Sequence, residues 1–175
     1  CLVGSEMCIR DRALAAYESL LAITELIFAC ERRLLTVIRS GLRMPDAKEI
    51  GETLKMEPAR LQLRFHLALE AGLISAQGNR YAATSKGLAW LDLDNQKRWE
   101  VLAEAVWDLP KLKTSGDLTQ AVTLDYPLMD PNQIKLLRYA EILGLTDQGS
   151  ATEQLKTPSG KWIASKLPKA VEAFV

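Results

Sequence analysis

Few side chains in this sequence have types and spacings that could do covalent chemistry. His66 is the only histidine, and it has no cysteine or second histidine that could share a metal ion with it. Ser159-Gly160-Lys161 looks like the end of a phosphate-binding loop, but Leu155 stands where that loop requires glycine and Trp162 where it requires Ser or Thr. We therefore predict no catalytic residue, no metal site and no cofactor, and hence no enzyme activity in this chain.

The side chains that could bind a ligand are mainly cationic. Arg60 and Arg64 are four residues apart, so a helix would place them on one flank, where they could reach phosphates or guanine edges. Asn79, Arg80 and Lys86 lie in or beside a predicted hairpin. These five residues are the predicted DNA contacts, and a solvated or salt-bridged flank is the alternative interpretation of the two helical arginines.

Composition limits how far this prediction extends. Among the 175 residues, 22 Lys and Arg balance 22 Asp and Glu, so there is no overall basic excess to attract phosphates. The hydrophobic content of 48% is typical of a globular protein with a core and not of a disordered chain. The apolar run near the start is expected to be too short and too interrupted by Glu18 and Glu25 to span a bilayer. We accordingly expect a cytoplasmic protein with no membrane partner.

Helices and a hairpin must position the candidate residues. Apolar residues at three- and four-residue steps predict a helix over residues 13–40. A short helix is expected over residues 47–54, begun by a capping box of Asp46 and Glu49. A three-residue turn then leads to a helix over residues 58–71, with proline at its first position.

A two-stranded ribbon is expected to follow. Its strands are predicted at residues 72–75 and 80–83, around a turn at residues 77–79. Thr84 then caps another helix, and a last helix is expected over residues 94–109. Two helices across a tight turn, followed by a hairpin, are the order of elements in a winged helix.

The last third of the chain partly repeats this order. Gly144-Leu145 matches Gly72-Leu73, and Thr157-Pro158-Ser159-Gly160 matches Thr84-Ser85-Lys86-Gly87 at almost the same spacing. We therefore predict a mainly α fold with short β-hairpins, arranged as tandem winged-helix modules. Residues 13–110 would be the first module with its flanking helices, and residues 111–175 a degenerate or truncated second one.

The first twelve residues have a separate interpretation. Their sequence, CLVGSEMCIRDR, resembles the translation of a transposase sequencing adapter, so we treat residues 1–12 as an artefact and the chain as a fragment of a longer protein. Cys1 and Cys8 are then not native. Cys30, on the apolar side of the predicted first helix, would be the one native cysteine, which excludes an internal disulfide.

Two leucines complicate the DNA interpretation. The core side of the helix at residues 58–71 is predicted to consist of Leu61, Phe65, Ala68 and Leu69. Leu63 and Leu67 would project the opposite way, where a groove-reading face should be polar. This pair predicts an interface with another domain or protein.

Residues 42–110 resemble the helicase-associated region of bacterial XPB-type helicase proteins. The segments that carry the resemblance are residues 48–54 (KEIGETL), 69–74 (LEAGLI), 81–91 (YAATSKGLAWL) and 98–110 (RWEVLAEAVWDLP). The resemblance implies a role in DNA binding, repair or transcription-linked remodelling, with any ATPase motor elsewhere in the parent protein. It implies no catalytic residue in this chain.

Several hypotheses stay open at this point. The first is a non-catalytic DNA-binding or DNA-positioning segment of a larger helicase-like protein, with duplex DNA as its partner. The second is a protein-interaction or dimerisation scaffold that binds the missing remainder of the parent chain or another protein. A methyltransferase dimerisation module is disfavoured because no strand with a glycine-rich turn follows, and the second module argues against a stand-alone repressor.

Overall fold

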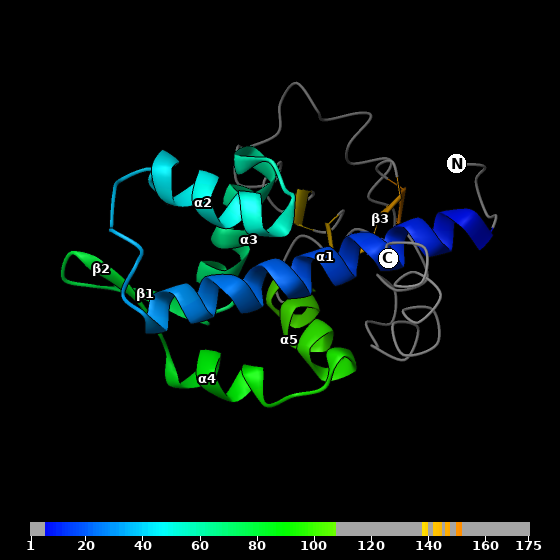
Figure 1. Ribbon diagram of the computed structural model, residues 1–175. Helices are drawn as coiled ribbons and strands as arrows, with labels where there is room; N and C mark the ends of the chain where they lie inside the picture. The colour runs from blue at the N-terminus through cyan, green and yellow to red at the C-terminus, as the bar shows by residue number, and fades with distance from the viewer. Residues whose placement is uncertain (1–5, 108–137, 140–141, 145, 148–149, 152–175) are drawn as a thin grey trace, which may run out of the picture. The chain divides into compact units, whose positions relative to one another are not determined.

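The computed structural model describes residues 6–107, 138–139, 142–144, 146–147 and 150–151 (Figure 1). Within these ranges the protein is mainly helical, with five helices, one antiparallel hairpin and a second, shorter hairpin. The chain divides into two compact units, one over Ser19–Asp94 and the other over Cys1–Glu18 together with Asn95–Val175. The mainly helical class with a hairpin is confirmed. The division into winged-helix modules over residues 13–110 and 111–175 stays a prediction.

Helix α1 (Glu6–Glu31) ends well before the expected residue 40. Arg33 takes a left-handed φ of 57° and the chain then becomes extended. The cause is local, because Leu34-Leu35-Thr36-Val37-Ile38 contains three β-branched residues, which favour extended backbone. Our prediction of a continuous helix over residues 13–40 was therefore wrong in its last third.

The extended segment pairs with the hairpin. The amide of Tyr81 donates to the carbonyl of Leu35, and the amide of Val37 donates to the carbonyl of Asn79, each at 3.0 Å. A bridge between Thr36 and Arg80 completes the pairing. Residues 35–37 thus pair with the end of the predicted ribbon through one isolated bridge and two backbone hydrogen bonds.

Helix α2 (Met44–Leu54) begins earlier than the capping-box interpretation allowed. Its N-cap is Arg43, and Asp46 lies inside the first turn, where it accepts a hydrogen bond from the Arg43 side chain. The prediction that Asp46 caps this helix was wrong because Pro45, with its preset φ, suits the first turn and lets the helix start before Asp46. A carboxylate in the first turn also complements the helix dipole.

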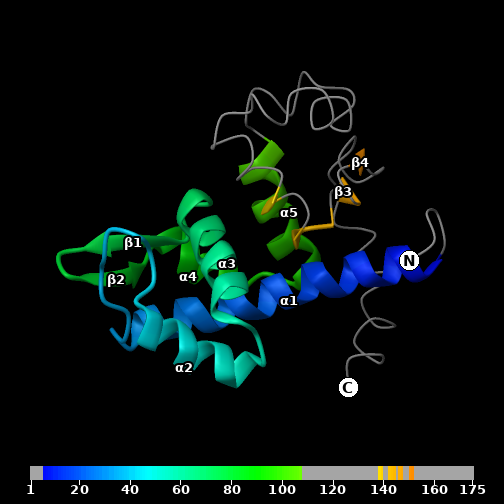
Figure 2. The ribbon, with the colours of Figure 1, turned by 90° about the horizontal axis from the view of Figure 1, so that it is seen from above.

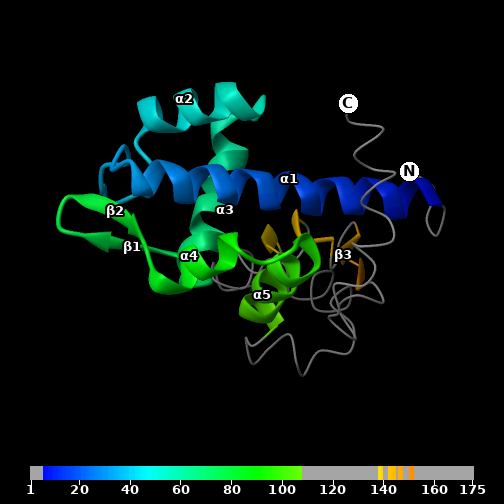
Figure 3. The same ribbon diagram turned by 60° about the horizontal axis from the view of Figure 1, so that its bottom comes forward.

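Helix α3 (Pro58–Glu70) begins at the predicted proline and is followed by Gly72, whose φ of 76° is left-handed. Strands β1 (Ile74–Gln77) and β2 (Arg80–Ala83) pair in antiparallel register, Ile74 opposite Ala83. The first strand lies later than the expected residues 72–75, because Gly72 belongs to the end of the helix. Figure 3 shows α3 crossing α1, with α2 and α4 on either side.

Helix α4 (Ser85–Leu91) starts as predicted, with the Thr84 hydroxyl accepting from the amide of Gly87 at 3.0 Å. Gly87 also lies directly against the Leu73 carbonyl, so a Cβ there would clash with backbone. Behind the hairpin, Tyr81 packs edge-on against Phe65 with ring centroids 4.8 Å apart. These contacts fix the hairpin to α3 and α4.

The core of this unit has the expected apolar side chains of α1 and α3. Cys30 is buried among them, as predicted, and burial together with the nearby Glu31 carboxylate raises the pKa of its thiol to about 12. Fully buried apolar residues of α1 and α3 in this unit include Leu20, Ile23, Ile27, Leu61, Phe65 and Ala68. Leu69, expected in the core, is half-buried.

The apolar part of α1 bears on the membrane expectation. Ala13–Glu31 is long and apolar enough to cross a bilayer by length and composition, so our judgement that this run is too short and too charged was wrong. Just over half of the most apolar stretch, 56%, is buried within the protein, and the core helix of a soluble protein passes the same test.

In the other unit, helix α5 (Asn95–Trp107) holds a buried tryptophan whose indole Nε1 donates to the Leu143 carbonyl at 2.8 Å. Gly144 has a left-handed φ of 73°, and strands β3 (Thr146–Asp147) and β4 (Ser150–Ala151) form the short hairpin after it. In the first unit, Gly72 likewise has a left-handed φ and precedes the β1–β2 hairpin. The predicted match at residues 157–160 lies outside the described residues.

Candidate nucleic-acid interface

Helix α3 carries the two arginines predicted to contact DNA, yet its middle is not accessible. Arg64 is 2% exposed, and its Nη1 donates to the Arg60 carbonyl at 3.1 Å. Leu67 is 0% exposed, whereas Leu63 is half-buried. The expectations that Arg64 lies on an open flank and that Leu67 projects away from the core were therefore wrong. Those expectations assumed that only one side of α3 is buried, but other segments pack against α3 on more than one side.

Residues 38–43 cover a further side of α3. The amide of Leu42 donates to the Gln62 Oε1 at 3.1 Å, and the Gln62 Nε2 donates to the Leu42 carbonyl at 2.6 Å. Gly41, with a φ of 111°, lies so close that a Cβ would be 2.9 Å from Gln62 Oε1 and from His66 Cε1. The exposed positions of α3 are Ala59, Arg60 and Glu70, at its two ends. With Arg64 buried and Gln62 bonded to Leu42, the middle of α3 presents few polar side chains that could reach base edges in a major groove.

His66 has a structural place in this arrangement. Its ring packs against Gly41 and lies edge-on to Phe65 at a centroid distance of 5.9 Å. In the part of the chain that the structure describes, no three His, Cys, Asp or Glu side chains gather as metal ligands would. The described residues of this site therefore offer charged groups and hydrogen-bonding groups to a ligand.

Exposed cations gather on the segment after α1 and on the hairpin. Residues 32–45 and 71–91 include six Lys and Arg and no Asp or Glu. The pairing of Thr36 with Arg80 brings these two acid-free stretches together, and Figure 2 shows the chain between α1 and α2 running alongside β2. All six cations are exposed: Arg32, Arg33, Arg39, Arg43, Arg80 and Lys86.

We call Arg33, Arg39, Asn79 and Arg80 the basic edge, because these four exposed residues flank or form the paired strands. Arg80 donates from Nη1 to the Thr36 hydroxyl at 2.8 Å, which fixes the direction of the guanidinium. A guanidinium has five N–H donors, so further donors can bind a phosphate. Arg39 lies in the turn that Ile38 and Gly41 close. The arrangement is suited to binding phosphates along a backbone.

The other cations stand apart from the basic edge. Lys86 is on α4, next to Gly72 and away from the hairpin tip at Gly78. The hydrogen bond and charge of Asp46 raise the pKa of Arg43, and their 3.1 Å ion pair occupies that guanidinium. Of the five predicted DNA contacts, the structure brings Asn79 and Arg80 together on one strand end, and Arg60 lies at the start of α3.

Sequence reasoning missed Arg33 and Arg39. Both fall within the helix predicted over residues 13–40, and that prediction did not place them beside the hairpin. A usable signal was present, because a β-branched run joined to two stretches without carboxylates indicates a paired, basic segment.

Comparison of the chain with family models, with curated proteins and with solved structures found no match. The resemblance to helicase-associated regions thus stays a prediction that rests on the sequence segments themselves.

Proposed function

We propose that Ser19–Asp94 is a winged-helix module that binds the phosphate backbone of duplex DNA through the basic edge. The chain would then be a non-catalytic DNA-binding or DNA-positioning segment of a larger helicase-like protein. The observation that carries this proposal is the pairing of Thr36 with Arg80, which joins two acid-free stretches into one exposed basic surface.

The order of elements supports the winged-helix assignment. α1 is followed by the strand segment at residues 35–37, then by α2, α3 and the β1–β2 hairpin. A hairpin in this position is the wing, which contacts phosphates or the minor groove in DNA-binding members of the fold. The second copy is supported by Gly144 and the β3–β4 hairpin, which occur in the same order as Gly72 and the first hairpin.

The covered α3 determines what kind of binding to expect. Contacts to phosphates position a protein on DNA but carry no sequence information, whereas base contacts do. Since the middle of α3 is buried or covered, the proposed mode is independent of sequence. Its affinity should fall with salt in proportion to the few phosphates that the edge neutralises.

The alternative from the sequence, an interaction scaffold centred on Leu63 and Leu67, is weakened because Leu67 is buried within the chain. No observation on α3 favours it.

The test is fluorescence anisotropy of the full chain with two labelled duplexes of unrelated sequence, at low and at physiological salt. The proposal predicts equal binding of both duplexes, with a clear salt slope. Arg39→Glu with Arg80→Glu should weaken binding by about tenfold or more at low salt. The matched control is Lys48→Glu with Lys55→Glu, the same change of charge on exposed residues of α2 and its cap. Equal losses in both double variants would contradict the proposal.

A further inference from the structure

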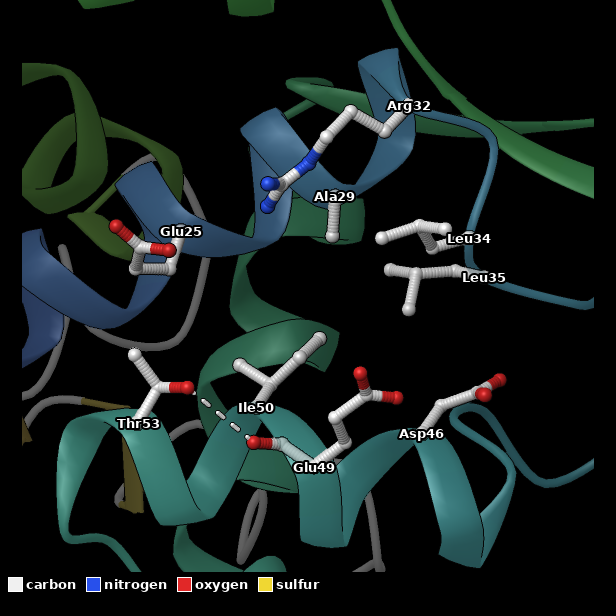
Figure 4. Close-up of a pocket in the computed structure, with 9 residues that line it drawn as sticks. All are labelled: Glu25, Ala29, Arg32, Leu34, Leu35, Asp46, Glu49, Ile50 and Thr53. Carbon is white, nitrogen blue, oxygen red and sulfur yellow. Dashed lines mark hydrogen bonds between the residues drawn. The ribbon is translucent and has the colours of Figure 1, made fainter.

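A cleft of about 270 Å³ separates α1 from α2 within Ser19–Asp94 (Figure 4). Four of the residues that line it are apolar: Ala29 comes from α1, Leu34 and Leu35 from the segment after it, and Ile50 from α2. Figure 4 shows these four side chains directed into the same space. The cleft therefore has an apolar patch beside a polar part of its lining.

Part of this apolar patch is exposed. Leu34 is 50% exposed and Ile50 is half-buried, whereas Ala29 and Leu35 are already buried beneath them. Apolar side chains of this size are normally covered, and their exposure at a concave surface is typical of a protein-interaction site. Leu34 and Ile50 would thus gain by contact with an apolar side chain from outside.

Carboxylates on both walls indicate the charge of what fits there. Glu25 is on the α1 wall and Glu49 on the α2 wall, and in Figure 4 they lie on either side of the apolar patch. A third, Asp46, is already bonded to Arg43. Arg32 is the one cationic side chain that lines the cleft in the described part of the chain. With Asp46 paired, the lining keeps two carboxylates to one guanidinium, and this excess of one negative charge favours a cationic ligand over a phosphate.

We propose that this cleft docks a basic amphipathic helix of a partner protein. An apolar side chain of that helix packs against Leu34 and Ile50. Lys or Arg residues one turn before and after it reach Glu25 and Glu49. This is the helix-in-groove mode of recognition, with apolar anchors at three- and four-residue steps. It uses none of the four residues of the basic edge, so the two proposals can fail separately.

The first test uses a fluorescein-labelled helical peptide made of Leu and Lys, with Leu at helical i, i+3, i+4 and i+7 positions. Its control is the same peptide with Glu in place of every Lys. Anisotropy titrations with the full chain should show saturable binding of the Lys peptide to one site. The Glu peptide should bind at least tenfold more weakly.

Two variants locate that binding. Glu25→Lys with Glu49→Lys should weaken binding of the Lys peptide by about tenfold or more, since it reverses charge on both walls. The matched control, Glu52→Lys with Glu57→Lys, makes the same change at exposed carboxylates outside the cleft and should have less than a threefold effect. Leu34→Ser should also weaken binding. Its side chain is half-exposed, so the fold should persist, and circular dichroism checks this.

Other outcomes would overturn the proposal. Equal losses in the two charge-reversal variants would show non-specific attraction. Unchanged binding of the Lys peptide in Glu25→Lys with Glu49→Lys would place the peptide elsewhere on the chain. Concentration-dependent dimerisation abolished by Leu34→Ser would make a second copy of this chain the occupant.

Discussion

Arg64 of helix α3 and Arg80 of the basic edge were both expected to contact DNA, and they differ in how far the fold buries them. The arginine in the middle of α3 is 2% exposed and donates to a carbonyl of its own helix. Arg80 at the basic edge is exposed and is directed by a single hydroxyl, that of Thr36. An identical side chain thus serves packing in one place and is available to a ligand in the other. The segment after α1 contacts Gln62 and His66 of α3 and pairs with the hairpin at Arg80, whose side chain stays exposed.

Charge reversal at Arg64 tests most strongly whether the two arginines differ in burial. A glutamate at this position would bury a carboxylate that cannot donate to the Arg60 carbonyl, at a cost of roughly 3 kcal/mol or more in the free energy of unfolding. Arg80→Glu, at an exposed position, should cost less than about 0.5 kcal/mol. Urea unfolding followed by circular dichroism measures both. Equal stability of the two variants would mean that Arg64 is not buried.

The buried side of the same unit can be tested through the Cys30 thiol. Its pKa in the folded protein is about 12, against an ordinary value of 9.0. A raised folded pKa gives stability that is fully present below pH 9 and is lost as the pH rises toward 12. The stability difference between the native chain and Cys30→Ala should therefore fall by roughly 2 kcal/mol between pH 8 and pH 10.5.

The measurement is urea unfolding at the two pH values, with Cys1→Ser and Cys8→Ser in both proteins so that only one thiol titrates. If this thiol were exposed, the difference in the free energy of unfolding between the protein with Cys30 and its Cys30→Ala variant would not change with pH.

The packing of residues 38–43 against α3 can be tested by a substitution at Gly41. Alanine there would need a φ of 111° and would meet Gln62 and His66 at 2.9 Å from its Cβ. We expect Gly41→Ala to cost about 1–3 kcal/mol in stability. Hydrogen exchange at the Leu42 amide, which donates to Gln62, should also accelerate. Gly78→Ala is a matched control at a second left-handed glycine, where nothing lies within 4 Å of the added Cβ; unchanged exchange at Leu42 in Gly41→Ala would argue against this packing.

The smallest expected effect concerns the direction of Arg80. Thr36→Val removes the hydroxyl that accepts from Arg80 while keeping a β-branched residue in the strand segment. Losing this hydrogen bond should weaken DNA binding by about twofold, because Arg80 keeps its charge and the guanidinium is only less fixed in direction. Anisotropy at low salt measures the change. A loss as large as that of Arg80→Glu would assign Thr36 a direct contact instead.

Local rules of sequence predicted much of the fold. Pro58 and Thr84 begin their helices as expected, and residues 80–83 form the predicted strand. The errors arose where spacing was ambiguous or where tertiary packing decided. Leu34 and Ile38 fit a helical step, yet their β-branched surroundings become a strand once a partner strand exists. The helical wheel of α3 could not show that Leu67 and Arg64 would be covered, because burial depends on which other segments pack there.

The central claim is that DNA contacts the basic edge and not α3. The most direct test is to titrate the ¹⁵N-labelled chain with an unlabelled duplex at low salt and follow backbone amide shifts. We predict that the largest changes will occur at residues 33–39 and 77–81, with small changes at residues 61–68. Large shifts confined to residues 59–68, with the hairpin unaffected, would contradict the account.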